Sequence, residues 1–300
     1  VTKMQICCEK LRHYFTLLLY ISIRAMVLMI AIVLFDDIIL LYWVLGTKSS
    51  LFKNFLEPKN LLNISMNILI PAAGLGTRFK ESHDSPKNMI DVKGDPMLVA
   101  AAKSLGLNKD GNQFIFLLPE DMLDDTHNSL GTRLQDEFPG CKVLVVVGQT
   151  EGAAQTAIQA FSFIDNDDEL LIANSDQIMH WDDKLRNDVF EKLREFEAGI
   201  ICLESDDPKH SYLDLVTGAI FEKEVQVGNM ALTGLHYFKN GKDFLTSTRL
   251  MMQSGTKSQG EYYIGPVYNW FEGEAGFYQI ESKEISFIGT PQDLADYLEK

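Results

Sequence analysis

The sequence has few cysteines and few basic residues, and each shortage excludes a class of protein. Four cysteines, at Cys7, Cys8, Cys141 and Cys202, are too few for a disulfide framework in a chain of 300 residues. No C-x-x-C and no cysteine–histidine cluster occurs, which argues against a zinc site and favours a reducing compartment such as the cytoplasm. Lys and Arg number 27 against 42 Asp and Glu, a formal net charge of −15. So acidic a chain is not expected to bind nucleic acid, because neutralising many phosphates requires clustered cations.

Internal repeats and Pro/Gly/Ser-rich linkers are also absent from residue 66 onward. The composition, 46% hydrophobic and 23% charged, is that of an ordinary globular protein and excludes a largely disordered chain. We therefore predict that residues 66–300 form one domain.

Residues 1–65 form an apolar N-terminal extension that differs from the rest. Residues 14–45 are almost continuously apolar, and Leu17–Phe35 has the length of a membrane span, interrupted only by Arg24. Met66 begins a segment that is typical of the start of a cytosolic enzyme. Two interpretations stay open: a membrane anchor on a cytoplasmic catalytic domain, or a misassigned upstream translation. A buried core helix fits Arg24 poorly.

The remainder alternates between strand and helix patterns. Strands are predicted at 67–70, 113–118, 142–147, 169–173, 199–203, 218–222 and 231–238, and helices at 96–105, 123–138, 152–163, 188–196, 242–253 and 292–300. This order predicts an α/β fold, a Rossmann-like, mixed and mostly parallel sheet with helices on both faces. The run KVLVVV at 142–147 has no polar alternation, which predicts a strand covered on both faces.

The most specific motif is a glycine-rich loop after the first predicted strand. It reads PAAGLGTRF from Pro71 to Phe79, with Ser-Pro-Lys ending at Lys87. The glycines allow backbone N–H groups to approach an anion, and Arg78 and Lys87 supply positive charge, so the loop suits a polyphosphate. Phe79 replaces the third glycine of the dinucleotide fingerprint, and no Gly-Lys-Ser/Thr follows, so neither that motif nor a P-loop is present.

These motifs resemble those of the sugar-phosphate nucleotidyltransferases, or pyrophosphorylases, whose signature is G-x-G-T-R with a downstream Pro-Lys. The resemblance covers nearly all of residues 66–300 and includes the closing GTPQDL at 289–294. The segments NSDQ at 174–177, GEYY at 260–263 and PVYN at 266–269 resemble the branch of the family found in capsule and surface-polysaccharide gene clusters.

The resemblance implies a nucleotidyltransferase (GT-A-like) fold and a reaction between an NTP and a phosphorylated small molecule that releases pyrophosphate. Arg78, Lys87 and Asp176 would be catalytic, with Asp176 holding Mg²⁺, the implied cofactor. The implied nucleotide-binding residues of the loop are Ala72, Ala73, Gly74, Gly76, Thr77 and Arg78.

Five further residues carry implied roles. Gln149 and Gly152 resemble the family's base-reading turn, where Gly152 would let a base lie against the backbone. Glu222 and Lys223 stand where the family has a substrate-binding Glu-Lys pair. Many members have an Asp as second metal ligand two residues before the final Gly-Thr. Phe287 stands there in this chain, and Glu261 is the substitute we consider, grouped with the substrate-binding residues.

Two other functions stay open. A glycosyltransferase of related fold would use a sugar nucleotide, although the expected Asp-x-Asp reads Asn174-Ser175-Asp176 here. A catalytically inactive nucleotide-binding subunit would be consistent with the missing second carboxylate at Phe287. The sequence does not identify the NTP, the acceptor (a sugar 1-phosphate, a phosphorylated amino acid or phosphocholine) or the oligomeric state.

Overall fold

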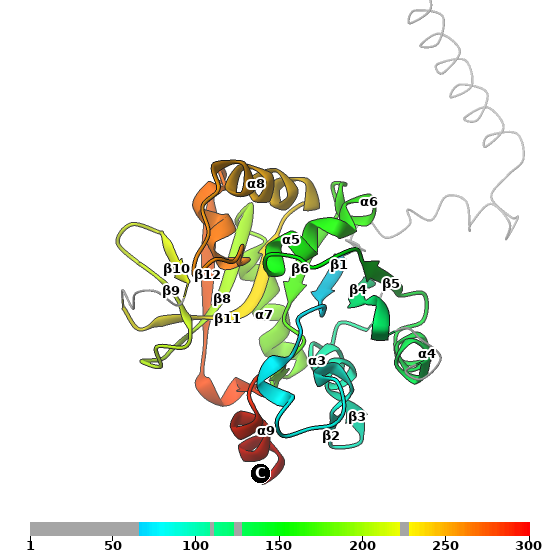
Figure 1. Cartoon of the computed structure of the whole chain (residues 1–300). Helices are drawn as coiled ribbons and strands as arrows, with labels where there is room; N and C mark the ends of the chain where they lie inside the picture. Colours follow the sequence, from blue (N-terminus) through cyan, green and yellow to red (C-terminus); the bar gives the residue numbers. More distant parts are fainter. Residues whose placement is uncertain (1–65, 109–110, 123–127, 223–227) are drawn as a thin grey trace, which may run out of the picture. The chain divides into compact units, whose positions relative to one another are not determined.

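The computed structural model describes residues 66–108, 111–122, 128–222 and 228–300 (Figure 1). The apolar extension lies outside these residues, so its membrane association and the domain boundary at residue 66 stay predictions. The strands are β1 (Met66–Pro71), β2 (Asp91–Val92), β3 (Asp95–Pro96), β4 (Gln113–Pro119), β5 (Lys142–Val146), β6 (Glu169–Ala173), β7 (Gln177–Met179), β8 (Ala198–Glu204), β9 (Ser211–Leu213), β10 (Ile220–Glu222), β11 (Met230–Phe238), β12 (Ala275–Ile280) and β13 (Ile285–Phe287).

Helices connect most of these strands. They are α3 (Met97–Ser104), α4 (Asn128–Glu137), α5 (Ala153–Ala157), α6 (Phe161–Ile164), α7 (Asp183–Leu193), α8 (Gly241–Ser254) and α9 (Pro291–Leu298). Short 3₁₀ helices occur at η1 (Thr77–Phe79), η2 (Lys87–Met89), η3 (Glu120–Met122), η4 (Ile158–Ala160), η5 (Gly265–Trp270) and η6 (Ser282–Glu284). No helix within the described residues is both long enough and apolar enough to span a bilayer.

One mixed sheet organises the fold. Its strand order is β10-β9-β11-β6-β1-β4-β5, and β8 pairs with β11 and β12. Strands β5, β4, β1 and β6 are parallel neighbours, whereas β11 is antiparallel to both β6 and β8. The predicted α/β class with a mixed sheet is therefore confirmed. The carboxyl ends of β1 and β6 lie at one edge, where open α/β sheets bind ligands.

Helices cover both faces of the sheet. Ile68 and Ile70 of β1 pack into a core with α3, α4 and α7, and Leu69 between them packs into a second core with α5, α6 and α8. This alternation follows from the period of two along a strand. Because both faces are buried, β1 is apolar at every one of these positions.

Capping residues fix the helix ends better than hydrophobic periodicity does. Helix α8 begins after Asn240, whose side chain accepts the Asp243 N–H at 3.0 Å, and ends at Gly255 with φ of 73°. Helix α7 begins five residues before the predicted 188 because Asp182 caps it by accepting the Leu185 N–H at 2.8 Å. The predicted helix 152–163 forms three short pieces, α5, η4 and α6.

The prediction that the strand at 142–147 is covered on both faces is wrong. Among the described residues, strand β5 is at the edge of the sheet and pairs with β4 alone. Val145 is 45% exposed, and Val147, just past the strand, is 82% exposed. A short apolar run predicts a strand but does not distinguish a central strand from an edge strand.

Candidate active site

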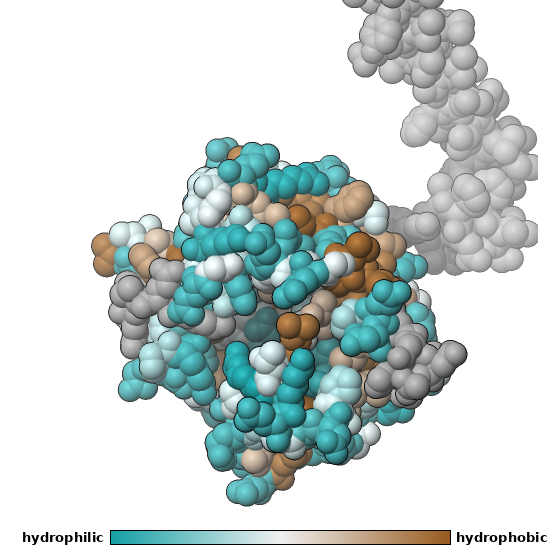
Figure 2. Space-filling model, in the orientation of Figure 1, coloured by the Kyte–Doolittle hydropathy of each residue, from teal (hydrophilic) through white to brown (hydrophobic). Residues whose placement is uncertain are grey.

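A cavity of about 710 Å³ opens at the carboxyl ends of β1 and β6. Its wall includes residues from the glycine-rich loop, the segment after β6, strands β9 to β11 and the segment before α9. The same face of the molecule is hollowed near its centre, and mostly hydrophilic residues border the hollow (Figure 2). The cavity therefore lies where the topology predicts a ligand.

The glycine-rich loop is fixed at both ends. The Ala72 N–H donates to the Leu117 carbonyl at 2.9 Å, and the Asn88 side-chain amide donates to the Ala72 carbonyl at 2.6 Å. Phe79 is buried in a small core with residues of β2 and α9, among others. These anchors hold the intervening glycines open to solvent and to the cavity.

Gly76 requires glycine for two reasons. Its φ is 57°, and a Cβ there would lie 2.8 Å from the Cβ of Lys87. The close approach brings the loop against the segment that carries Lys87. Of the loop residues predicted to bind nucleotide, Ala72, Gly74, Gly76 and Arg78 line the cavity. Ala73 and Thr77 are not among the lining residues.

Lys87 and Asp176 meet in the cavity wall although 89 residues separate them. The Lys87 Nζ lies 2.6 Å from the Asp176 Oδ2, and both side chains are partly buried. Arg78, by contrast, is exposed in the cavity and has no carboxylate partner among the described residues. Of the two cations, Lys87 is therefore paired with a carboxylate, and Arg78 is available to a ligand.

The carboxylate of Asp176 packs against the backbone of the closing GTPQDL segment. The Ile288 N–H donates to the Asp176 carbonyl at 2.9 Å, and a Cβ on Gly289 would lie 2.8 Å from Oδ2. Phe287 lines the cavity nearby, and its ring packs on His210 with centroids 4.7 Å apart. The closing segment therefore shapes the site, with an aromatic ring where many family members have a carboxylate.

Two further carboxylates, those of Glu222 and Asp293, line the same cavity, and Asp293 pairs with Lys209. Within residues 66–300, apart from the three gaps, no group of three or more His, Cys, Asp or Glu side chains could hold a metal ion. Glu261, the substitute considered from sequence, is exposed and does not line the cavity.

The predicted base-reading turn is held by the segment before η5. The Tyr262 N–H donates to the Glu151 carbonyl at 2.7 Å, and the Ala154 N–H donates to the Tyr262 carbonyl at 2.9 Å. Gly152 has φ of 128°, and a Cβ there would lie 2.5 Å from the Tyr262 carbonyl oxygen. Packing against Tyr262 thus requires this glycine. Gln149 is exposed, and neither residue lines the cavity, although Ala153 does. Their roles in nucleotide binding stay predictions.

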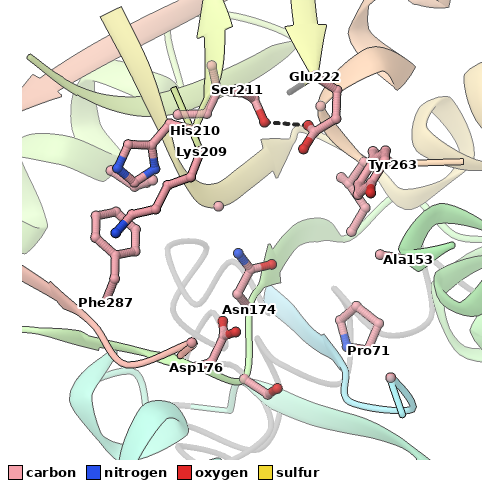
Figure 3. Close-up of a pocket in the computed structure, with 18 of the residues that line it drawn as sticks. Pro71, Ala153, Asn174, Asp176, Lys209, His210, Ser211, Glu222, Tyr263 and Phe287 are labelled. Atoms are coloured by element: carbon pink, nitrogen blue, oxygen red, sulfur yellow. Dashed lines mark hydrogen bonds between the residues drawn. The ribbon is translucent and has the colours of Figure 1, made fainter. Parts of the chain in front are cut away.

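The far wall of the cavity comes from the hairpin β9–β10. Glu222 is buried, lines the cavity and accepts a hydrogen bond from the Ser211 hydroxyl (Figure 3). Lys223, its predicted partner in substrate binding, lies outside the described residues. The structure therefore brings Glu222 into the same cavity as Arg78, Lys87 and Asp176.

Several lining residues were missed by sequence reasoning. These residues are Lys209, His210, His236 and Tyr263. The first three stand outside any recognisable local motif, and Tyr263 lies in a segment noted only for family resemblance. Burial lowers the pKa of His236 to about 3, so this imidazole is neutral, and its Nδ1 has no hydrogen-bond partner in the described residues. Burial and the Glu261 carboxylate raise the pKa of Tyr263 to about 12.

Comparisons with known proteins agree with this fold. A nucleoside-diphosphate-sugar pyrophosphorylase from Vibrio cholerae RC9 has a similar structure, with a TM-score of 0.66 and 19% identity over 78% of this chain and 100% of that one. A protein described as a candidate glucose-1-phosphate thymidylyltransferase from Bacillus anthracis, solved with sucrose, is also similar. Its TM-score is 0.61, with 20% identity over 78% of this chain and 94% of that one. HddC from Yersinia pseudotuberculosis has a TM-score of 0.55, with 20% identity over 78% of this chain and 98% of that one.

No family model and no curated protein matches the sequence. At these identities the structural likeness establishes the fold alone. The chain therefore has the nucleotidyltransferase fold, with a cavity of mixed charge at the carboxyl ends of β1 and β6.

Proposed function

We propose that the protein is a Mg²⁺-dependent nucleotidyltransferase. It couples an NTP to a phosphorylated small molecule, releases pyrophosphate and supplies an activated precursor for surface polysaccharide. The observation that carries the proposal is the meeting of Gly74, Gly76 and Arg78 with the Lys87–Asp176 pair in one cavity. A glycine-rich backbone with two cations suits a triphosphate, and a nearby carboxylate suits a divalent cation.

The chain's own residues perform positioning and charge neutralisation. In this reaction an oxygen of the acceptor's phosphate forms a bond to the α-phosphorus, and the bond from that phosphorus to the pyrophosphate oxygen breaks. No covalent intermediate with the enzyme is needed, so alignment and electrostatics account for catalysis. Backbone N–H groups of the loop and Arg78 hold the triphosphate and the departing pyrophosphate, and Lys87 stabilises charge at the α-phosphate.

The residues around Asp176 fit a magnesium ion that is bound together with nucleotide. Mg²⁺ prefers carboxylate and phosphate oxygens and commonly binds through one or two carboxylates plus substrate phosphates, so Asp176 alone is a sufficient protein ligand. The Asn174 side chain, in the same wall, adds an amide oxygen (Figure 3). When bound, the ion neutralises phosphate charge.

At the other end of the cavity, Glu222 would accept hydrogen bonds from hydroxyls of the acceptor. It is buried, and the Ser211 hydroxyl donates a hydrogen bond to one of its carboxylate oxygens. Lys223 and Glu261 are further acceptor-binding candidates on the resemblance alone. The proposal also includes association with a membrane through residues 14–45, which is based on the sequence alone.

A pyrophosphate-release assay tests the proposal. The full chain is incubated with Mg²⁺, each of CTP, UTP, dTTP and GTP in turn, and a panel of sugar 1-phosphates, phosphocholine and phosphorylated amino acids. Release with a particular NTP–acceptor pair is the expected result. If none of the four NTPs binds in calorimetric titration, the assignment of Gly74–Arg78 is wrong. Binding without release would favour a nucleotide-binding subunit, and turnover only with a sugar nucleotide would favour a glycosyltransferase.

A further inference from the structure

Lys209 lies in the loop between β8 and β9, which no sequence motif singled out. It lines the main cavity and also a smaller cavity of about 310 Å³. Figure 3 places Lys209, His210 and Phe287 on one side of the main cavity, and Pro71 and Ala153 on the other. Pro71 leads into the glycine-rich loop, so Lys209 lies across the cavity from the proposed triphosphate site.

Two carboxylates hold the ammonium group of Lys209. Its Nζ lies 3.0 Å from the Asp207 Oδ2 and 3.3 Å from the Asp293 Oδ1. The Asp207 side chain also accepts the Lys209 backbone N–H at 3.0 Å, and Asp293 accepts the Thr290 hydroxyl at 2.7 Å. The hydrogen bond to Asp207 is the main cause that raises the pKa of Lys209. Lys209 is therefore charged near neutral pH and held in place.

One hydrogen-bond donor of Lys209 remains available. A lysine ammonium group has three N–H donors and no acceptor. Asp207 and Asp293 accept two of them, and the described residues supply no third acceptor. The remaining N–H can therefore serve a ligand in the cavity that Lys209 lines.

The surrounding charge decides which ligand atom this donor suits. Lys209 carries one positive charge and its two partners carry two negative charges, so the group as a whole is negative by one. An anionic oxygen next to Lys209 would be attracted by one cation and repelled by two carboxylates. An uncharged hydroxyl or carbonyl oxygen would gain a charge-assisted hydrogen bond without that repulsion.

We propose, on the basis of the proposed function, that Lys209 is a specificity residue of the acceptor site. It donates a hydrogen bond to an uncharged oxygen of the acceptor, a hydroxyl or a carbonyl, and it does not bind the reacting phosphate. Acceptors that present such an oxygen are favoured over phosphocholine, whose oxygens all belong to its phosphate.

Calorimetric titration of the full-length protein tests this directly. The ligands are the 1-phosphates of glucose, galactose and mannose, with phosphocholine and inorganic phosphate as members that lack a carbon-bound hydroxyl. Each is titrated with Mg²⁺, in the presence and absence of α,β-methylene NTP analogues. We expect at least one sugar 1-phosphate to bind more tightly than both hydroxyl-free ligands.

Lys209→Met keeps the length of the side chain and removes its donors. It should weaken the preferred sugar 1-phosphate about tenfold, the usual effect of losing a charge-assisted hydrogen bond, and change inorganic phosphate less than twofold. Lys209→Arg should recover part of the loss. Lys192→Met is the matched control, because Lys192, on α7, pairs with Glu195 just past the helix and does not line the cavity.

Several results would overturn the inference. Equal weakening of all five ligands in Lys209→Met would mean that Lys209 binds the phosphate. Unchanged binding of all five ligands would mean that Lys209 donates no hydrogen bond to an acceptor oxygen. The same conclusion would follow if the wild-type protein preferred no hydroxyl-bearing ligand. Failure of the proposed function is seen separately. If the titrations give the expected result but no nucleotide is transferred, the hydrogen bond from Lys209 is supported and the nucleotidyltransferase proposal is wrong.

Discussion

At the residue scale, Asp176 combines two properties that a metal-binding carboxylate needs. It lies at the carboxyl end of β6 in the cavity wall, and its negative charge is kept in place by Lys87 at 2.6 Å. Under the proposed function, Lys87 would contact the phosphate of a bound triphosphate, and Asp176 would hold the cation that accompanies it. One ion pair thus prepares both partners of the proposed substrate.

Asp176→Asn is expected to lower Mg²⁺-dependent turnover at least about 100-fold, because the amide cannot replace an anionic metal ligand. Asn still accepts a hydrogen bond from Lys87, so the free energy of unfolding should change by less than about 1 kcal/mol. Steady-state kinetics and urea unfolding measure the two effects. Asp188→Asn, at an exposed position on α7, is the control. Full turnover in Asp176→Asn would contradict the metal assignment.

His236 gives a pH dependence with a definite sign. Burial lowers its pKa from 6.5 to about 3. Between these values the unfolded chain binds a proton that the folded protein does not, so the free energy of unfolding decreases as the pH falls. The slope contributed by this one group is about 1.4 kcal/mol per pH unit below pH 6.5.

Urea unfolding between pH 5 and 6.5 measures that slope. His236→Gln should lower stability at every pH, because it removes ring packing against Tyr268, and should also flatten the pH dependence. The smaller slope of the free energy of unfolding against pH, rather than the overall loss of stability, identifies the contribution of His236. Parallel pH profiles of the two proteins would mean that His236 is protonated without cost in the folded state.

At the element scale, the turn at residues 149–152 and the segment before η5 form one unit. Two backbone hydrogen bonds join Glu151 and Ala154 to Tyr262, and Lys257 pairs with Glu151 at 2.7 Å. Tyr263, the next residue, faces the cavity. This arrangement connects the turn that resembles a base-reading element to the wall that also includes Glu222.

Gly152→Ala should loosen this unit. Gly152 has φ of 128° and ψ of 170°, a region essentially restricted to glycine, and its added Cβ would meet the Tyr262 backbone. Gly148→Ala is a matched control, because Gly148 also has positive φ, 73°, but no atom within 4 Å of an added Cβ. In urea unfolding, Gly152→Ala should cost at least about 1 kcal/mol more than Gly148→Ala. Equal losses would contradict the close packing.

At the scale of the whole molecule, local patterns predicted the central strands and the glycine-rich loop. Strand β6 runs over the predicted 169–173, and the loop lines the cavity through Gly74 and Arg78. These features depend on residues close together in sequence. The edge position of β5 could not be predicted, because it depends on which strands pair and not on the apolar run itself.

The far wall of the cavity could not be predicted for a similar reason. Lys209, His236 and Tyr263 come from three segments that meet only when β8 to β11 and the chain before η5 are in place. Lys209 and His236 belong to no short motif, and Tyr263 lies in the GEYY segment, which was noted only for family resemblance. Asp293 shows the same limit: the closing GTPQDL motif was recognised, but its hydrogen bond to Lys209 required the fold.

The most direct measurement of the central claim is ³¹P NMR of the reaction mixture for the NTP–acceptor pair that the release assay identifies. The account predicts that the NTP and acceptor-phosphate signals fall together. Pyrophosphate and a new diphosphate-linked product should appear in equal amounts, because one phosphorus–oxygen bond forms as another breaks. Orthophosphate with a nucleoside diphosphate, or NTP signals that stay unchanged while the nucleotide is bound, would contradict nucleotidyl transfer.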